Sequence, residues 1–387
     1  MLINLRNALM TGKRLPYDAE VEYLESMGTQ WINTGITPTP SDTVRIVADL
    51  ALTSINTGDN NIVFGSYIET PTVRQFAFVD RTAKARIAYV GAASGTVTVA
   101  ASTDYLFEAQ FAPGNSYLNV NGATSSQNTS TATVLPTQPM ALFACRYADS
   151  VISPSSMRLR SCKIYLNNLL VRDYIPVRKG TTGELYDRVS GKLFGNAGTG
   201  DFVLGQDVVP VEWLEATGTQ YINTGKKLTS DDVVDITASR TNNNSFFGSS
   251  ETNKWFNITV SSGRTMFRFG ATANSAPRPL DGQVSTMSCG KKWIVDGVEV
   301  AEPSGDFVGS YDCVVFARNG TAVTDYLSGR VYKFSITTNG TKVMGLLPVR
   351  VGTEGAMMDV LTRRIYRNAG TGAFTFGNDL KYPIPAS

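Results

Sequence analysis

One stretch of the sequence decides the fold, and it occurs twice. Residues 21–35 read VEYLESMGTQWINTG, and residues 211–225 read VEWLEATGTQYINTG. Eleven of the fifteen positions are identical at an offset of 190, and two of the differences exchange one aromatic residue for another. Self-similarity of this kind indicates that the chain contains the same structural unit twice.

A second repeated block closes each copy. Residues 176–207 and 348–379 share fifteen of thirty-two positions at an offset of 172, including the run Asn-Ala-Gly-Thr-Gly. Since the offset falls from 190 to 172, the second copy is shorter in its middle, as loop shortening between fixed strands would produce. The first twenty residues show no counterpart. We therefore predict an N-terminal segment at 1–20, a first domain at 21–208, a second domain at 209–380 and a tail at 381–387.

Weaker matches fall between the two blocks, in the same order in both copies. Phe64-Gly65-Ser66 corresponds to Phe247-Gly248-Ser249, and Phe143-Ala144 corresponds to Phe316-Ala317. Because the order is preserved while the offset drifts, we expect these residues to lie at equivalent places in two similar domains.

The local patterns are those of strands and hairpin turns. Residues 43–48 show a period of two, in which Val44, Ile46 and Ala48 share one face. Residues 233–238 repeat it with Val234, Ile236 and Ala238. Asn121-Gly122 and Asp296-Gly297 each follow a short apolar run and predict turns with positive φ. Few stretches keep a helical period, so we predict an all-β chain made of two tandem β-sandwich or jelly-roll domains.

The composition excludes several classes of function. The 387 residues contain no histidine, which excludes Ser-His-Asp triads, Cys-His dyads and histidine-ligated metals. With 35 Lys+Arg and 33 Asp+Glu, the formal net charge of +2 argues against a nucleic-acid partner. No stretch approaches the roughly 20 apolar residues of a membrane span, so we expect no membrane insertion. The start of the chain does not read as a secretion signal.

The four cysteines are too few and too scattered for a disulfide framework. Cys145, Cys162, Cys289 and Cys313 show no Cys-x-x-Cys spacing. We predict buried free thiols, with a cross-strand disulfide between Cys145 and Cys162 as the alternative.

A glycosidase would need two carboxylates that face each other across a sugar. Glu20, Glu22 and Glu25 fit a glycosidase-like spacing superficially, but Pro210 stands where the second copy should repeat Glu20. We therefore predict a structural edge strand here and no catalytic residues. A glycoside hydrolase stays the weakest of the functional alternatives.

Two further patterns could hold a ligand. The glycine-rich run at 195–200 is followed by strand-like residues rather than by a helix, which favours a tight turn over a phosphate cradle. The loop carboxylates Asp59, Asp231 and Asp232 could ligate calcium, but neither group is preserved in both copies. We predict no metal site and no cofactor.

Both repeated blocks carry a resemblance to a known family. The pattern E-[YW]-L-E-x-x-G-T-Q-[WY]-I-N-T-G resembles the first strand of laminin-G-like modules, and P-V-R-x-G-T-x-G…D…N-A-G-T-G-x-F resembles their last strands. These modules belong to the concanavalin A-like lectin/glucanase jelly rolls. The lead NLRNALMTGKRLPYDAEVEYLES resembles the lead of bacteriophage virion proteins of this type.

The resemblance implies a non-enzymatic virion structural protein, assembled in the host cytoplasm. A head fibre, a capsid decoration protein and a tail appendage all fit this description. The resemblance also implies a homo-oligomer, for which closed cyclic assemblies are the commonest form. A bacterial surface carbohydrate-binding protein is the alternative from another class.

The N-terminal segment is the predicted attachment point to other virion proteins. Its apolar stripe and flanking charges suit a peptide that orders on a partner surface, with a frayed terminus as the alternative. The virion-anchoring candidates are Leu2, Leu5, Arg6, Leu9, Lys13 and Arg14.

Aromatic residues are the candidates for contact with host-surface glycans. The exchanged pairs Tyr23/Trp213 and Trp31/Tyr221 lie in the best-matched block, so we predict that they pack in the core or between sheets. Trp255 and Trp293 are less constrained by the repeat, and we predict them as the exposed glycan-contact residues.

Overall fold

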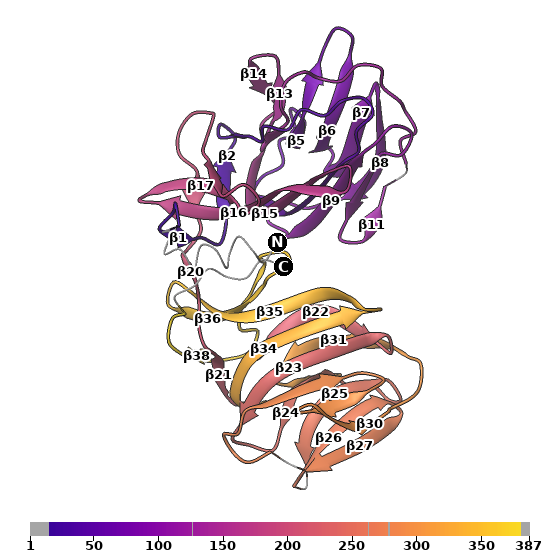
Figure 1. The fold of residues 1–387 in the computed structure, drawn as a ribbon, viewed down its shortest axis with the longest axis vertical. Helices are drawn as coiled ribbons and strands as arrows, with labels where there is room; N and C mark the ends of the chain where they lie inside the picture. The colour runs from indigo at the N-terminus through magenta and orange to yellow at the C-terminus, as the bar shows by residue number, and fades with distance from the viewer. Residues whose placement is uncertain (1–14, 126, 262, 278, 381–387) are drawn as a thin grey trace. The chain divides into compact units, whose positions relative to one another are not determined.

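The computed structural model describes residues 15–380 except 126, 262 and 278. Every regular element in this part of the chain is a β-strand, which confirms the all-β prediction. The chain divides into two compact units, Met1–Asp207 (unit 1) and Val208–Ser387 (unit 2), which run from indigo to magenta and from rose to yellow in Figure 1. The predicted tail 381–387 and all six virion-anchoring candidates, Leu2, Leu5, Arg6, Leu9, Lys13 and Arg14, lie outside the described residues.

Unit 1 is built from an 11-stranded and an 8-stranded sheet. The larger sheet has the order β11 (Ala123–Thr124), β10 (Tyr117–Val120), β9 (Tyr105–Phe111), β4 (Val44–Leu52), β15 (Ser156–Leu166), β16 (Leu169–Lys179), β17 (Thr182–Asp187), β18 (Lys192–Phe194), with β1 (Ala19–Glu20), β2 (Leu24–Met27) and β19 (Val203–Leu204) beside this path. The smaller sheet has the order β14 (Ser150–Ile152), β13 (Cys145–Tyr147), β5 (Asn61–Ile68), β6 (Val73–Val79), β7 (Lys84–Val90), β8 (Ala92–Thr98), with β3 (Ile32–Asn33) and β12 (Ala141–Leu142) beside it.

Unit 2 repeats this plan with an 11-stranded and an 8-stranded sheet. The larger sheet has the order β30 (Val298–Ala301), β29 (Trp293–Val295), β28 (Ser285–Cys289), β23 (Asp232–Arg240), β34 (Ser328–Thr338), β35 (Thr341–Val351), β36 (Glu354–Asp359), β37 (Ile365–Tyr366), with β20 (Val208–Pro210), β21 (Leu214–Thr217) and β38 (Thr375–Phe376) beside this path. The smaller sheet has the order β22 (Ile222–Thr229), β31 (Val308–Val315), β24 (Ser245–Ser249), β25 (Trp255–Ser261), β26 (Arg264–Gly270), β27 (Thr272–Pro277), with β32 (Arg318–Asn319) and β33 (Val323–Thr324) beside it.

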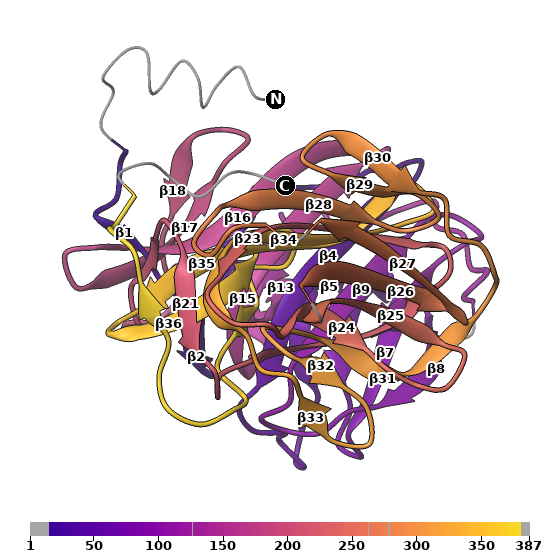
Figure 2. The same ribbon diagram turned by 90° about the horizontal axis from the view of Figure 1, so that it is seen from below.

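The hydrophobic core of each unit is shared by its two sheets. In unit 1, Ile46 of β4 and Phe64 of β5 belong to one buried cluster, and in unit 2 Ile236 of β23 joins Phe256 of β25. Figure 2 shows strands of the larger sheet of unit 2, such as β28 and β23, as a layer beside β26 and β25. Alternate residues of β4 and β23 point into these cores, which confirms the predicted period of two.

The two predicted hairpin turns are present. Asn121 and Gly122 have φ values of 50° and 87°, and Asp296 and Gly297 have values of 49° and 82°. These turns join β10 to β11 and β29 to β30, whose antiparallel pairing begins directly beside the turn. Asn, Asp and Gly adopt positive φ with the smallest steric penalty, so these residues set the register of both hairpins.

The weaker sequence matches mark identical backbone irregularities. Gly65 and Gly248 have φ values of 147° and 150°. A Cβ atom added at Gly65 would lie 2.3 Å from the Gln75 carbonyl oxygen, and one added at Gly248 would lie 2.2 Å from the Asn257 Cβ. Phe143 and Phe316 have φ values of 70° and 71°, which is rare for a bulky residue. The two units therefore share strained positions as well as their strand order.

The first twenty residues have a partial counterpart in unit 2, contrary to the prediction. In β1, Ala19 lies opposite Arg178 of β16, and in β20 Val209 lies opposite Arg350 of β35. Backbone hydrogen bonds hold both strands, and such bonds do not depend on which side chains are present. The sequences of β1 and β20 can therefore differ. Tyr17 also packs within unit 1, beside Ile175 and Val177, so the packed part of this unit begins before residue 21.

Replacement of Gly248 by alanine should destabilise unit 2 by more than the 1–3 kcal/mol expected for backbone strain alone, because the new Cβ also collides with Asn257. Gly297→Ala is the matched control, since its φ is also positive but no atom lies within 4 Å of the added Cβ. Chemical denaturation followed by tryptophan fluorescence measures both effects. Equal destabilisation by the two substitutions would contradict the close approach at Gly248.

Candidate functional site

The two repeated sequence blocks meet inside each unit. In unit 1 the closing strand β19 pairs with the opening strand β2, with Val203 opposite Glu25. In unit 2 β38 pairs with β21 in the same way, with Thr375 opposite Glu215. The residues that the two copies share most closely therefore join the start of each unit to its end.

One asparagine in each unit fastens this junction. The side-chain oxygen of Asn196 accepts hydrogen bonds from the backbone N–H groups of Trp31 (3.1 Å) and Gly198 (2.8 Å), and its amide donates to the Gly200 carbonyl oxygen (2.6 Å). Asn368 makes the three equivalent bonds at 3.1, 2.9 and 2.9 Å. The glycine-rich run is a turn in both units, as predicted, and all polar groups of this asparagine are engaged in holding it.

A glutamine of the opening block makes a second set of matched bonds. The Gln30 side-chain oxygen accepts from the Met27 backbone N–H at 2.8 Å, and its amide donates to the Asp201 carbonyl oxygen at 3.0 Å. Gln220 does the same in unit 2, at 2.9 and 3.1 Å. Both glutamines are buried, so these bonds satisfy polar groups that water does not reach.

The glutamates that suggested a glycosidase do not share one strand. Glu20 ends β1, Glu22 lies in a bend, and Glu25 lies in β2. Glu20 accepts a hydrogen bond from the Tyr17 hydroxyl at 3.2 Å, and Glu25 pairs with Arg158 at 2.7 Å. The prediction of an edge strand is wrong for β2, because β2 lies between β15 and β19.

The first aromatic pair of the opening block lies half-buried on the sheet, so the prediction of core packing is wrong for it. The Arg158 guanidinium lies 4.6 Å from the ring centre of Tyr23, and the Arg330 guanidinium lies 4.0 Å from that of Trp213. Each arginine also forms an ion pair with the neighbouring glutamate of β2 or β21. The ring, the guanidinium and the carboxylate thus form one stacked surface group in each unit.

The second aromatic pair is also half-buried. Trp31 packs against the core of unit 1, as predicted, and lies 5.2 Å from the Arg146 guanidinium. The ring centre of Tyr221 lies 6.1 Å from that of Tyr326.

The loop carboxylates that suggested calcium make contacts within the protein. Asp59 accepts a hydrogen bond from the Ser153 hydroxyl at 2.9 Å, and Asp231 pairs with Lys291 at 3.3 Å. Asp232 is buried and accepts a backbone hydrogen bond at 2.7 Å. Within the described part of the chain, no group of three or more Cys, Asp and Glu side chains is placed to hold a metal ion.

All four cysteines are buried free thiols, as predicted, and the alternative disulfide between Cys145 and Cys162 is not formed. Burial raises the pKa of every one of these thiols above its ordinary value. Because the thiolate is the reactive form, none of the four is suited to nucleophilic chemistry at neutral pH.

The two predicted glycan-contact residues differ in exposure. Trp293 is fully buried in the core of unit 2, with its ring centre 5.7 Å from that of Phe267, so the prediction of an exposed Trp293 is wrong. The short strand β29 directs this large ring between the sheets, where aromatic burial contributes most to core stability. Trp255, at the start of β25, is half-buried and stays a candidate for ligand contact.

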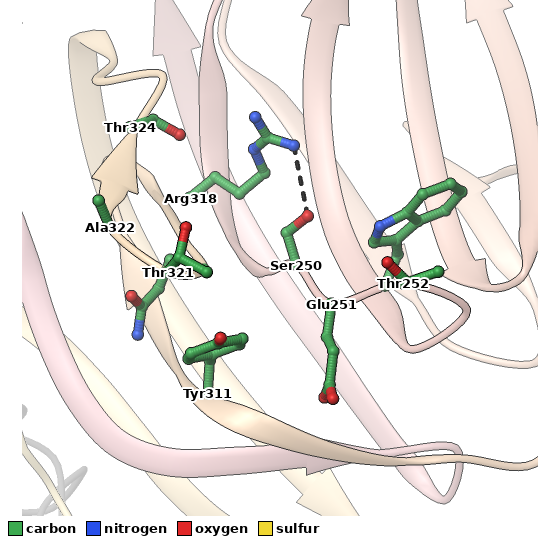
Figure 3. A pocket seen from close by; sticks show the side chains of 11 residues that line it. Ser250, Glu251, Thr252, Tyr311, Arg318, Thr321, Ala322 and Thr324 are labelled. Carbon is green, nitrogen blue, oxygen red and sulfur yellow. Dashed lines mark hydrogen bonds between the residues drawn. The ribbon is translucent and has the colours of Figure 1, made fainter.

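Trp255 lines a depression of about 410 Å³ in unit 2. The depression lies between the loop that follows β24 and the hairpin formed by β32 and β33. Figure 3 shows Ser250, Glu251 and Thr252 on the loop and Thr321 on the hairpin, with Tyr311 of β31 below them. A larger hollow of about 620 Å³ lies beside Asp231, but Lys291 forms ion pairs within it.

The two charged side chains that line the Trp255 depression, Arg318 and Glu251, each have an oppositely charged partner. The Arg318 guanidinium lies 2.6 Å from the Asp325 carboxylate and donates to the Ser250 hydroxyl at 3.3 Å. Glu251 pairs with Lys254 at 3.2 Å. Hydrogen bonding from Ser310, followed by that from Lys254, holds the pKa of Glu251 below its ordinary value, so its carboxylate is ionised at neutral pH.

Sequence reasoning identified Trp255 but missed the other walls of this depression. Tyr311 and Arg318 lie far from Trp255 in the chain, and neither is identical to its counterpart in unit 1. The signals that could have pointed to them are Ser250, which follows the matched Phe-Gly-Ser, and the turn residues Asn319-Gly320.

Comparisons with known proteins identify no family. No protein-family model matches the chain, and no curated protein matches it. Among solved structures, domains LG4-5 of the mouse laminin alpha1 chain are similar at 11% identity and a TM-score of 0.32, over 96% of each chain. The spike protein of feline infectious peritonitis virus strain UU4 is similar at 7% identity and a TM-score of 0.13, over 87% of this chain and 32% of that one.

A search of the described residues finds no helix that is long and apolar enough to cross a membrane.

Asn368→Ala should destabilise unit 2 by about 1–3 kcal/mol, because it removes three hydrogen bonds that each contribute on the order of 1 kcal/mol. Asn196→Ala should have a similar effect on unit 1. Denaturation midpoints of the two full-length variants measure this. An unchanged midpoint for both would show that the matched asparagines do not hold the junction.

None of the four thiols should react with an aromatic disulfide reagent in the native protein at about pH 8, whereas all four should react after unfolding. The raised pKa values keep the thiols protonated well above neutral pH, and burial blocks access. Absorbance of the released thiolate counts the reacting groups, and the unfolded sample is the control. Rapid reaction of even one thiol in the native state would contradict the burial.

Proposed function

We propose that this protein is a non-enzymatic structural protein of a bacteriophage virion, namely a head fibre, a capsid decoration protein or a tail appendage. Its two units would be laminin-G-like jelly rolls of the concanavalin A-like type. The resemblance of the repeated blocks and of the N-terminal lead supports the phage assignment.

One structural observation supports a passive role for the two units. Two polar residues that both copies share hold the opening block to the closing segment, namely Asn196 with its counterpart Asn368 and Gln30 with its counterpart Gln220. Duplication has thus preserved a shape. A shared catalytic group would have been expected to show instead as matched carboxylates facing one another across a cleft.

The N-terminal segment would attach the protein to another virion protein, and the units would then be displayed from a homo-oligomer. The six candidate anchoring residues precede Tyr17, whose ring packs against Tyr186 with centres 5.0 Å apart. Because Leu15 and Tyr17 pack within unit 1, the proposed anchor would lie before them in the chain.

A second candidate function is carbohydrate binding at a bacterial surface. The half-buried Trp255 in its polar depression is the observation that favours it. The two functions are compatible if the virion uses this depression to contact the host.

Mass spectrometry of purified virions should detect this chain, whichever virion protein it binds. A chain lacking residues 1–14 should stay folded but be absent from the particles, because the deletion removes every candidate anchoring residue and spares Tyr17. Deletion of 381–387 is the matched control and should leave incorporation unchanged. Absence of the full-length chain from virions would refute the virion role, and normal incorporation of the 1–14 deletion would refute the anchor.

A further inference from the structure

We propose that the depression beside Trp255 in unit 2 is a binding site for an uncharged saccharide. This inference rests on the second candidate function, carbohydrate binding, and gives it a ligand class and a place; it does not depend on the protein being part of a virion. It rests on the lining of the depression, on its charge balance and on the corresponding place in unit 1.

The depression offers aromatic faces together with polar groups. Trp255 is half-buried, and the Arg268 guanidinium lies 5.6 Å from its ring centre. Tyr311 supplies a second half-buried ring. A pyranose has apolar C–H faces and a rim of hydroxyl groups, so it needs this combination of rings and hydrogen-bonding side chains. The volume of about 410 Å³ lies within the range of roughly 300–1,000 Å³ for small-molecule sites.

The polar side chains of the lining are suited to hydroxyl groups. Ser250, Thr252, Thr321 and Thr324 bring hydroxyls, each able to donate and to accept. The Asn319 amide donates to the Asp312 carbonyl oxygen at 2.9 Å, which orients its carboxamide. These groups come from both sides of the depression (Figure 3), so a ligand with hydroxyls around its rim could contact both sides at once.

One buried donor in the wall lacks a partner among the described residues. The Nε–H of Arg318 is buried and makes no hydrogen bond there, whereas its terminal nitrogens bond to Ser250 and Asp325. Buried donors of this kind are uncommon, and an ordered water or a ligand oxygen commonly satisfies them. Because solvent does not reach this Nε–H, it belongs to the interior of the wall and is not a contact point for a ligand in the depression.

The charge balance of the lining favours an uncharged ligand over an anion. Asp325 neutralises Arg318, and Lys254 neutralises Glu251, so the charged side chains that line the depression are balanced. Arg268 stacks on Trp255 but is not one of the lining residues. An acidic sugar would also meet the carboxylate of Glu251, and repulsion between like charges would oppose its binding. An uncharged sugar meets neither problem, and Glu251 can accept hydrogen bonds from its hydroxyls.

The corresponding place in unit 1 is filled by side chains. In the parallel pair β5–β13, Ser66 lies opposite Arg146 and Tyr67 opposite Tyr147, and in β24–β32 Ser249 lies opposite Asn319. Tyr67 and Tyr147 therefore stand where unit 2 has Ser250 and Gly320. Their rings stack with centres 5.3 Å apart, and the Tyr147 hydroxyl donates to Glu69 at 2.6 Å. The open depression is thus a feature of unit 2 that small side chains create.

Saturation-transfer NMR on the full-length chain tests this inference. The probes are the methyl glycosides of glucose, galactose, mannose and N-acetylglucosamine, with methyl glucuronide as the charged comparison. We expect saturation transfer to at least one uncharged glycoside and weaker transfer to the glucuronide.

Two variants locate the site. Trp255→Ala should abolish the signal because it removes the aromatic face. Ser250→Tyr should also abolish it, because it places the unit 1 side chain in the depression without changing the backbone. Trp213→Ala is the matched control, since Trp213 is a half-buried tryptophan of the same unit that also lies under an arginine, and it should leave binding unchanged. Thermal unfolding verifies that each variant is folded.

Absence of transfer to all four uncharged glycosides would overturn the inference. So would a signal that survives in folded Trp255→Ala and Ser250→Tyr, because binding would then lie elsewhere. Stronger transfer to the glucuronide would overturn the uncharged ligand class. Mass spectrometry of virions measures whether the chain is part of the particle, and saturation transfer measures saccharide binding. Either the virion role or the saccharide site can therefore fail while the other stands.

Discussion

Each unit depends on the pairing of its opening strand with its own closing segment. In unit 1, Leu24 and Leu204 lie opposite each other although about 180 residues separate them in the chain. The entropic penalty for closing a long loop grows only slowly with its length, but local contacts must still offset it. Asn196 contributes here because its side chain holds the closing turn and binds the backbone of the opening block at the same time. This double role explains why the opening and closing blocks are similar in the two copies, whereas the segments between them are not.

The same constraint explains which parts of the fold could be predicted from the sequence. The period of two in residues 43–48 and the Asn-Gly and Asp-Gly turns are local signals, and the structure confirms both. The correspondence of β1 with β20 was missed, because backbone hydrogen bonds hold both strands and leave no shared side chains to detect. A strand of this kind can be found only through its partner in the sheet.

The candidate site was harder to predict than the fold, for a related reason. Trp255 and Trp293 both lie outside the two closely matched blocks, so those blocks do not assign either residue to the core or to the surface. Trp293 is buried because Phe267, on a strand of the other sheet, meets its ring across the core. Trp255 lines a depression because a loop and a distant hairpin leave space beside it. Both environments depend on contacts between segments far apart in the chain, which no local pattern reports.

Because the fold is duplicated, the two units can differ in what they contact while they keep the same backbone structure. Ser66 and Ser249 keep equivalent places in the ladder, as do the positive φ values of Phe143 and Phe316 nearby. On that shared backbone, unit 1 places two stacked tyrosines and unit 2 leaves an open depression. Since the matched side-chain hydrogen bonds lie in the end blocks and the core lies between the sheets, side chains on the connecting loops are free to change. A residue that both copies share is therefore best interpreted as stabilising the common fold, and a binding site is best sought where the copies differ.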